Sequence, residues 1–251
     1  MKKIEIIPLK NFPHIKPKVN IGGEIVKCIK RNKITIKEND IFVIAHKVIS
    51  ISEGRTVKLS DIRVSSKAKT LSKTVEKDPR IIQLIINESK ELIKINPKFI
   101  LTRDKYGVIA ANAGVDQSNI SGDEKALLLP KNANKSAKEI SVKILDEFGI
   151  NTSIIISDSV GRPWRNGLTQ IAIGSYGLPS VVSYNIDLYG NELFDTDVPV
   201  IDELSSAGGL LMIKNLGIPV VIIRGYNYSF IKKGIKNLIR SREDDIFSKI
   251  T

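Results

Sequence analysis

The chain is poor in the residues that build disulfides and nitrogen- or sulfur-ligated metal centres. Its 251 residues include one cysteine, Cys28, and two histidines, His14 and His46. A single cysteine excludes an intrachain disulfide and a multi-cysteine metal site, and two histidines exclude a histidine-rich centre. Any bound metal is therefore expected to be oxygen-ligated, as Mg²⁺ or Mn²⁺ is. Cys28 is interpreted as a small buried hydrophobe on a helix and not as a nucleophile.

Long hydrophobic runs are absent as well. No apolar stretch approaches the roughly 20 residues that cross a bilayer, and the start, MKKIEIIP, lacks the longer apolar region of a secretory signal. With 42% hydrophobic and 26% charged residues, the composition is that of a folded soluble protein. Together with the single cysteine, these features predict a cytoplasmic protein with no membrane partner.

Negative charge is scarce in the first part of the chain. Residues 1–100 hold 22 Lys and Arg against 10 Asp and Glu, whereas residues 101–251 hold 17 of each, so the first part carries the whole net charge of +12. A basic region of this kind can meet nucleic acid or a polyanionic small molecule. Solvated lysines are the favoured interpretation, because no aromatic RNA-binding run, zinc-finger spacing or arginine-rich arm accompanies them. Nucleic acid is therefore not expected as a partner.

Several well-known motifs are missing too. The sequence has no G-x-x-x-x-G-K-[ST] phosphate loop, no strand-linked G-x-G-x-x-G, no H-E-x-x-H and no G-x-S-x-G. What it does contain is an alternation of apolar strand and helix patterns without a low-complexity linker, a repeat or a clear domain boundary. This predicts a mixed α/β protein with some antiparallel pairing. Strands are expected at residues 3–7, 41–50, 99–102, 108–111, 153–157, 170–174 and 220–224, and helices at 21–31, 67–76, 79–95, 136–148, 199–214 and 228–240.

Polar, glycine-bearing segments interrupt this scaffold after two of the expected strands. The first is NAGVDQSN at residues 112–119, where Asp116 and Asn119 offer hard oxygen ligands; a loop of turn-forming residues explains it equally well. The second is SDSVGRPWRNG at residues 157–167, where Asp158 and Ser159 suit Mg²⁺ or Mn²⁺ and two arginines suit phosphate. A plain surface loop with an exposed Trp164 is the less favoured alternative for this second segment.

Two further segments carry weaker signals. SISEGR at residues 50–55 ends the expected strand 41–50, which carries His46 and Lys47. A strand running into a turn, with a structural histidine, is the favoured interpretation, and Lys47 is a candidate point charge for a phosphate. The last segment, DELSSAGGLL at residues 202–211, runs on to Lys214. Close helix packing explains its small residues best, and a backbone approach to a nucleotide is the alternative.

Taken in order, these segments resemble the coenzyme F420:L-glutamate ligase family. The similarity runs from IEIIP at residues 4–8 to PVVIIRG at residues 219–225, which is most of the chain. Its most specific pieces are NAGVDQSN at 112–119 and DSVGRPWRNGLT at 158–169, followed by AIG at 172–174 and DLYGNEL at 187–193.

The resemblance implies GTP-dependent addition of L-glutamate to the deazaflavin precursor F420-0. The acceptor carboxylate would be phosphorylated, and the glutamate amine would then displace phosphate to form an amide, with Mg²⁺ or Mn²⁺ and a potassium ion bound. The implied fold is a single α+β domain over residues 1–251, made of two interlocked subdomains with mixed, partly antiparallel sheets, in an intertwined homodimer. A related ligase with another acceptor carboxylate, and a non-catalytic ligand- or nucleic-acid-binding descendant, are the alternatives.

The resemblance also assigns residues. Asp116 and Asp158 are the catalytic carboxylates and, with Ser159, the metal ligands. The expected cofactor-binding residues are Phe12, Pro13, His14, Ile15, His46, Lys47, Asn119 and Lys214, the last of which falls near an acidic metal ligand of some members.

One position departs from the family pattern. Members usually carry Ser-Lys-Ala-Glu-Gly-Arg where this chain has SISEGR, so Ile51 stands in place of a nucleotide-contacting lysine. Lys47 is the candidate substitute, although positions four apart on a strand are well separated.

Overall fold

The computed structural model describes residues 3–118, 122, 124–194, 196–241 and 243–245. Its centre is a five-stranded sheet in the order β1-β12-β2-β8-β9. Of the neighbouring pairs, β2 and β8 run parallel and the others run antiparallel. The strands are β1 (Glu5–Pro8), β2 (Ile41–Ala45), β8 (Ser153–Arg162), β9 (Arg165–Tyr176) and β12 (Val220–Arg224). The predicted mixed α/β class is confirmed.

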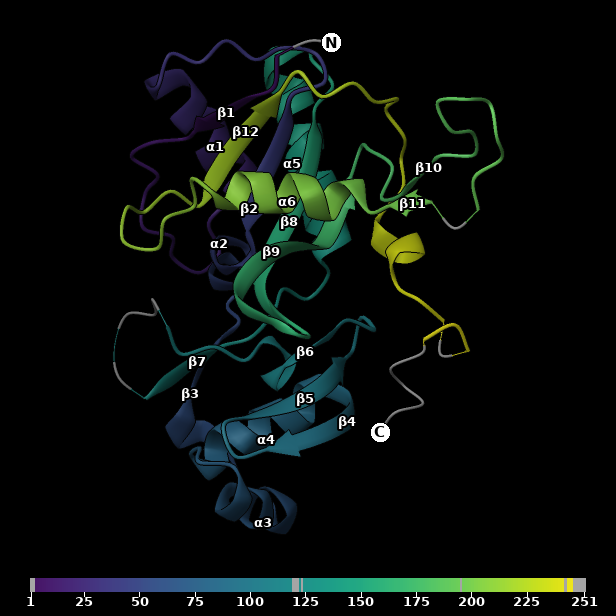
Figure 1. The fold of residues 1–251 in the computed structure, drawn as a ribbon. Coiled ribbons are helices and arrows are strands. Elements are labelled where there is room, and N and C mark those ends of the chain that lie inside the picture. Colours follow the sequence, from purple (N-terminus) through teal and green to yellow (C-terminus); the bar gives the residue numbers. More distant parts are fainter. Residues whose placement is uncertain (1–2, 119–121, 123, 195, 242, 246–251) are drawn as a thin grey trace.

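Helices cover both faces of this sheet, which is why its central strands are apolar throughout. On one face, α1 (Ile21–Arg31) and α5 (Ala133–Phe148) pack over Phe42, Ile44 and their neighbours. On the other face, α6 (Val200–Gly209) packs over Ile41 and Val43, and Figure 1 shows it crossing in front of the sheet. Alternate residues of β2 therefore belong to two different cores, and the whole assembly is called the sheet lobe below.

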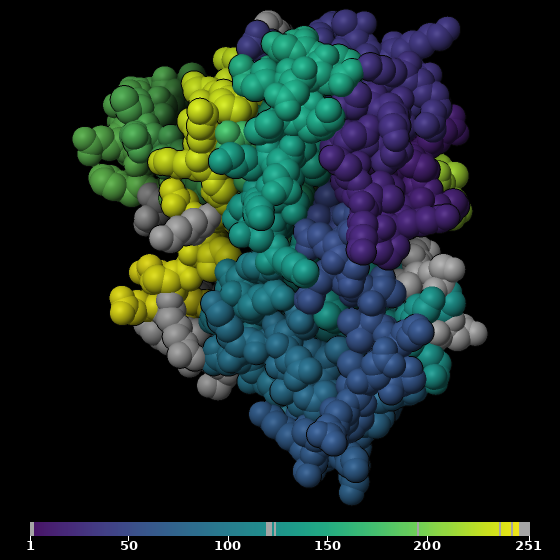
Figure 2. Space-filling model, turned by 180° about the vertical axis from the view of Figure 1, so that it is seen from behind, coloured from purple at the N-terminus to yellow at the C-terminus, as the bar shows by residue number. Residues whose placement is uncertain are grey.

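A third core lies outside the sheet and forms the small lobe. It is built around Ile82, Ile85 and Ile100, which are buried. Figure 2 shows this lobe in blue below α5 (teal) and the N-terminal segment (purple). Its elements are β3 (Thr56–Lys58), α3 (Ser66–Thr74), α4 (Pro79–Glu88), β4 (Ser89–Asn96), β5 (Phe99–Asp104), β6 (Ile109–Ala111) and β7 (Lys125–Leu127), with short 3-10 turns at Leu59–Asp61 and Asn112–Gly114.

Three small elements complete the description. The helix α2 (His46–Ser52) follows β2 directly. A two-stranded arm, β10 (Val182–Ser183) with β11 (Asp197–Val198), projects from the sheet lobe at the right of Figure 1. A 3-10 turn spans Ile235–Leu238. Within the residues given above, none of the helices is long and apolar enough to cross a membrane. Cys28 is buried on α1 and unpaired, as predicted.

Several element boundaries differ from the prediction. The expected strand 41–50 ends at Ala45 and continues as α2, because its apolar run fits a buried strand and a buried helix equally well. The expected helix 79–95 ends at Glu88, and Ser89–Asn96 pairs with β5 instead. The expected helix 199–214 ends at Gly209. Over residues 228–240 the expected helix is replaced by an isolated bridge between Ile231 and Gly177 and by the short turn Ile235–Leu238.

The segment 157–167 is also more regular than a loop. β8 and β9 extend through it as a hairpin, with Arg162 paired to Arg165 across the turn. Trp164 sits in this turn with φ of 63° and is 82% exposed. A β-turn of this form needs a positive φ at its third position, which glycine usually supplies. The exposed tryptophan of the alternative interpretation is therefore present, but on a hairpin and not on a loop.

Candidate active site at the sheet edge

At one edge of the five-stranded sheet, β1 and β2 end and β8 continues beyond its pairing with β2. β2 runs parallel to β8, and β1 runs in the same direction because both β1 and β2 are antiparallel to β12. The segments that follow Pro8, Ala45 and Ser157 therefore emerge together. Ligands of open α/β sheets bind at such edges. Most residues predicted for the site follow these strand ends.

His46 is the first residue of α2 and is 2% exposed. Its Nε2 lies 3.2 Å from Oδ1 of Asp158, and its Nδ1 lies 3.3 Å from the hydroxyl of Ser50 one turn along the helix. Both ring nitrogens thus face polar partners, which orients the imidazole. His46 lies on a helix and not on the expected strand. From this position its side chain contacts Asp158 of β8.

Lys47 forms an ion pair with a different carboxylate, that of Asp116. Its Nζ lies 2.6 Å from Oδ2 of Asp116 and donates to the carbonyl and hydroxyl of Ser118 at 2.8 and 2.9 Å. Asp116 also accepts the amide N–H of Ser118 at 2.8 Å. Burial opposes ionisation of Asp116, but the hydrogen bonds from Lys47 and Ser118 outweigh it and hold the pKa of this carboxyl below its usual value. Ser118 is a site residue that the prediction did not name.

Asp116 reaches the site from the small lobe. Its backbone bridges to Leu127 by two hydrogen bonds of 3.0 and 2.8 Å, which extend the β3–β7 ribbon. Asp158 lies on β8, in the sheet lobe. Because His46 and Lys47 are consecutive, a single peptide bond connects the partners of the two carboxylates. The two acids that the sequence assigned to the site thus contact consecutive residues of α2.

Ser159 faces a different side of β8. A register shift lies between Ile156 and Ser157, immediately before Asp158, and such a bulge re-aims side chains. Adjacent strand residues point to opposite faces, and the hydroxyl of Ser159 accepts a 2.7 Å hydrogen bond from Nε2 of Gln170, on the α6 side. Gln170 was expected in a strand but not as a partner of a site residue. Ser159 and Asp158 thus have different partners.

The remaining predicted residues fall into three groups. Phe12 and Ile15 are half-buried against the α1–α5 core, so a ligand would meet their backbone more than their side chains. Pro13 is half-buried and His14 is exposed, in the same loop after β1. Lys214 is exposed in the connection that leads to Pro219, whose carbonyl accepts the N–H of Ala45 at 2.8 Å. Asn119 lies outside the described residues.

The helical form of α2 changes how the Ile51 position is understood. Residues four apart on a helix share a face, with Cβ atoms about 5–6 Å apart. Lys47 therefore lies one turn before Ile51 on the same side of α2. The expectation that these positions are well separated is wrong, because it assumed a strand.

The donors around the two acids suit a hard cation. Mg²⁺ and Mn²⁺ prefer carboxylate, hydroxyl, carbonyl and water oxygens, and Asp116, Asp158 and Ser118 offer the first three kinds. In the part of the chain that the structure describes, no cluster of three or more His, Cys, Asp or Glu side chains gathers around one point. The donor set fits an ion that keeps several waters, as Mg²⁺ does.

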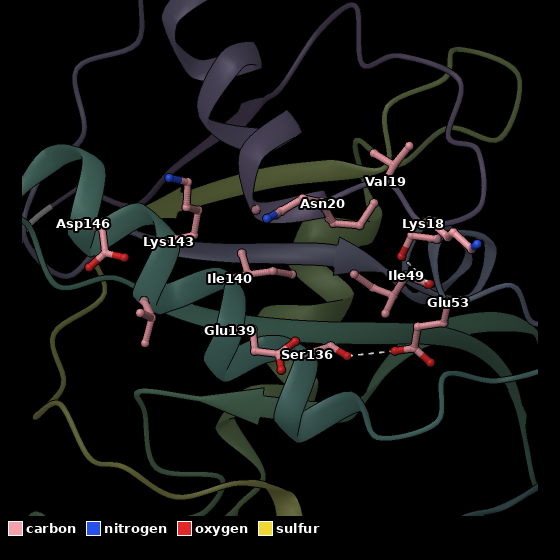
Figure 3. Close-up of a pocket in the computed structure, with 14 residues that line it drawn as sticks. Lys18, Val19, Asn20, Ile49, Glu53, Ser136, Glu139, Ile140, Lys143 and Asp146 are labelled. Carbon is pink, nitrogen blue, oxygen red and sulfur yellow. Dashed lines mark hydrogen bonds between the residues drawn. The ribbon is translucent and has the colours of Figure 1, made fainter.

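A cavity away from this site is bounded by three helices. It measures about 530 Å³ and is bounded by the start of α1, by α2 and by α5 (Figure 3). Ile49, Ser52 and Glu53 line it, away from the face of α2 that carries Lys47 and Ile51, and Glu53 accepts a 2.9 Å hydrogen bond from Ser136. None of the predicted site residues lines this cavity. The two carboxylates that contact His46 and Lys47, and not the size of a cavity, identify the candidate site.

Comparison with known proteins gives the family. The family model described as F420-0:Gamma-glutamyl ligase matches residues 10–225. The chain is 40% identical over 250 residues to the coenzyme F420:L-glutamate ligase of Methanocaldococcus jannaschii, covering 98% of this chain and 97% of that protein. It is 34% identical to the protein of that name from Methanothermobacter thermautotrophicus, covering 97% and 98%. For the Archaeoglobus fulgidus protein of the same name the identity is 32%, covering 98% and 97%.

These matches extend over nearly the whole of each protein and include both acid-bearing segments. The chain therefore belongs to the F420-0:gamma-glutamyl ligase family, which confirms the resemblance drawn from its motifs and the expectation of a ligase.

Proposed function

We propose that this protein joins L-glutamate to F420-0 through an amide bond, using GTP and a divalent metal ion. The observation that carries the proposal is the placement of Asp116 and Asp158 against the consecutive residues Lys47 and His46. Acyl activation by a nucleoside triphosphate requires a cation-binding pair of acids next to a positive charge for the phosphates. The sheet edge offers both.

Each side chain then has a role. Asp116 and Asp158 would hold Mg²⁺ or Mn²⁺ together with water, and the metal supplies neutralisation of the charge on the transferred phosphoryl group. Lys47 would move from Asp116 toward a nucleotide phosphate, since an ammonium on a flexible stem adapts to either partner. His46 holds Asp158 in place, and the loop 12–15 would contact the nucleotide from the neighbouring strand end. Ser159 is proposed as an outer contact of the metal, and Lys214 as a contact of the nucleotide.

The chemistry has two steps. The acceptor carboxylate of F420-0 takes the γ-phosphoryl group of GTP, which leaves GDP. The amine of L-glutamate then attacks the acyl carbon, the C–N bond forms, and inorganic phosphate departs with the C–O bond electrons. The residues at the sheet edge bind and orient the partners of the first step.

We also propose a homodimer formed through the β10–β11 arm. Five large side chains in the segment between the two strands of this arm are exposed, which is a large apolar surface for so short a segment. Leu188 and Tyr189 are 91% and 86% exposed at the turn of the DLYGNEL motif. A second copy is the proposed occupant, because an isolated two-stranded ribbon is marginally stable and gains most from packing against a partner. The five side chains are Tyr184, Ile186, Leu188, Tyr189 and Phe194.

The decisive assay combines purified protein with GTP, Mn²⁺, F420-0 and labelled L-glutamate. A γ-glutamyl product that depends on all four components is expected. Turnover of GTP stimulated by glutamate without F420-0 would point instead to another acceptor carboxylate. Absence of any product while Mn²⁺ still binds would overturn the proposal.

A further inference from the structure

A second, smaller cavity lies along the edge strand β9. It measures about 230 Å³ and is enclosed by β9, by the β5–β6 hairpin, by Asp202 of α6 and by Ile235, Leu238, Ile239, Arg240 and Asp245 near the end of the chain. Ligand pockets for drug-sized molecules occupy roughly 300–1,000 Å³, so a nucleotide or a deazaflavin does not fit here. The cavity suits a molecule the size of a free amino acid. No residue that the sequence assigned to the site lines it.

One wall of the cavity carries a carboxylate, Asp202, that accepts few hydrogen bonds. Asp202 lies in the first turn of α6, and its Oδ1 accepts the N–H of Ala172 at 2.8 Å. Among the described residues this is the single hydrogen bond of the Asp202 side chain, and no Lys or Arg pairs with it. Burial raises the pKa of Asp202. A half-buried carboxylate in this state is stabilised by a cationic ligand, such as an ammonium group.

The same cavity also presents positive charge. Arg103 lies in its wall, with Nε 3.3 Å from Glu91 and Nη2 3.5 Å from Asp245. Both distances exceed those of strong charge-assisted hydrogen bonds, about 2.7–2.9 Å, and Asp245, which is buried, also lines the cavity. Arg240 lies at the exposed rim. Arginine's planar fork matches a carboxylate, and two arginines suit a molecule with two carboxylates.

The cavity is adjacent to the candidate active site through the sheet. Ile171, which lines the cavity, is the cross-strand partner of Asp158. Directly opposed residues on antiparallel strands have Cβ atoms about 4.5–5.5 Å apart and point to the same face. Ala172, the residue held by Asp202, is the next residue of β9. A ligand in this cavity therefore lies one strand away from the carboxylate of Asp158.

We infer that this cavity, with Asp202 facing an ammonium group and Arg103 and Arg240 facing carboxylates, is the binding site for the amino dicarboxylic acid substrate. The inference rests on the proposed function for the identity of that substrate, L-glutamate. It separates the two halves of the reaction in space: the phosphates and metal lie at His46 and Lys47, and the amine approaches along β9. Asp202 is a binding residue in this arrangement, and Arg103 selects for the second negative charge.

The test compares L-glutamate with glutarate, which has both carboxylates but no amine. Binding of each to the full chain is measured by calorimetry with GDP and Mn²⁺ present, for the wild type, for Asp202→Asn and for Glu203→Gln. Asparagine keeps an oxygen for the N–H of Ala172, so the variant should fold. Glu203 is the exposed neighbour of Asp202 on α6 and serves as the matched control.

Asp202→Asn is expected to weaken L-glutamate binding about tenfold, the usual cost of losing a hydrogen bond to a charged group. Glutarate affinity should stay unchanged, and Glu203→Gln should match the wild type for both ligands. Equal weakening of both ligands, no weakening of either, or no glutamate binding by the wild type would overturn the site assignment. The outcomes also separate the two proposals. If Asp202→Asn forms the amide product with an unchanged KM for glutamate, only the assignment of the cavity is rejected. If glutamate binding depends on Asp202 but no product forms, only the ligase proposal is rejected.

Discussion

The ammonium of Lys47 lies 2.6 Å from Oδ2 of Asp116, and this ion pair connects the sheet lobe to the small lobe. A divalent ion at Asp116 would compete with that ammonium for the same carboxylate. Release of Lys47 by the arriving metal would then free its charge for a phosphate.

Removal of either acid should stop the metal-dependent reaction. Asp116→Asn and Asp158→Asn are each expected to lower kcat by more than about a hundredfold, because changes even in the outer shell of a metal site cost 10–100-fold. Asparagine keeps the size of each acid and one hydrogen-bond-accepting oxygen, so thermal melting should stay near that of the wild type. Asp61→Asn, an exposed acid of the small lobe, is the control. Near-full turnover in either site variant would show that the metal is held elsewhere.

Restoring the usual lysine should strengthen nucleotide binding. Ile51→Lys adds a positive charge on the face of α2 that carries Lys47, and we expect GTP to bind up to about fivefold more tightly, in the range of a partly exposed charge pair. Ser52→Lys places the same charge about 100° around the same helix, where Ser52 lines the 530 Å³ cavity, and should leave the affinity unchanged. Fluorescent-nucleotide titration measures both. If Ile51→Lys leaves the GTP affinity as unchanged as Ser52→Lys does, Lys47 or another group already supplies the charge.

The ion cluster behind the site should contribute stability that depends on pH. Glu88 accepts hydrogen bonds of 2.7 Å from both Arg55 and Lys105. Burial opposes its ionisation, but these two partners outweigh burial and lower the pKa of Glu88. Breaking such a cluster by removing one partner costs about 3 kcal/mol, so Glu88→Gln should lower the free energy of unfolding by about that amount at pH 7.

The sign of the pH dependence follows from the lowered pKa. The contribution of Glu88 is complete above its unfolded-state pKa of about 4.3 and is lost as the pH falls through the lower folded-state value. The difference between the wild type and Glu88→Gln should therefore shrink below about pH 4 in urea unfolding experiments. Glu139→Gln, which removes an exposed pair with Lys135, should change stability by less than about 1 kcal/mol. A pH-independent difference for Glu88→Gln would contradict this account.

The projecting arm should control the oligomeric state. Replacing Leu188 and Tyr189 together by aspartate should convert the proposed dimer into a monomer of 27.8 kDa, because charges in an apolar interface lose their solvation. Light scattering after size-exclusion chromatography measures the mass. Ile95→Asp alters an exposed apolar residue of the small lobe and should leave the mass unchanged. A wild type that runs as a monomer at micromolar concentration would remove the basis of this prediction.

Much of the fold could be predicted because local signals agreed with the tertiary structure. The helix Ile21–Arg31 has the predicted bounds, since Asn20 caps it and its apolar residues repeat at helical spacing. The run from Ile41 to Ser50 was misassigned because a continuous apolar sequence carries no period. The chain leaves the sheet at Ala45, where the strand pairing with β8 ends at Ser157, and that limit depends on residues far away in the sequence.

The candidate site was only half predictable for a similar reason. Asp116 and Asp158 lie in segments whose composition indicates oxygen ligands, and the family resemblance assigned them directly. The contacts of Lys47 with Asp116 and of His46 with Asp158 depend on the helical form of α2, which the sequence did not reveal. Asp202 and Arg103 are 99 residues apart in the chain and carry no motif that relates them. Such a juxtaposition follows from topology alone.

The bond between His46 and Lys47 also gives the molecule a mechanical property. Each lobe anchors one acid, and the two anchors meet on neighbouring residues that cannot move apart. A shift of one lobe against the other by about one ångström would break at least one of these short contacts. Because the proposed metal site needs one acid from each lobe, turnover should fall with any strain that tilts the small lobe, well before either core begins to melt.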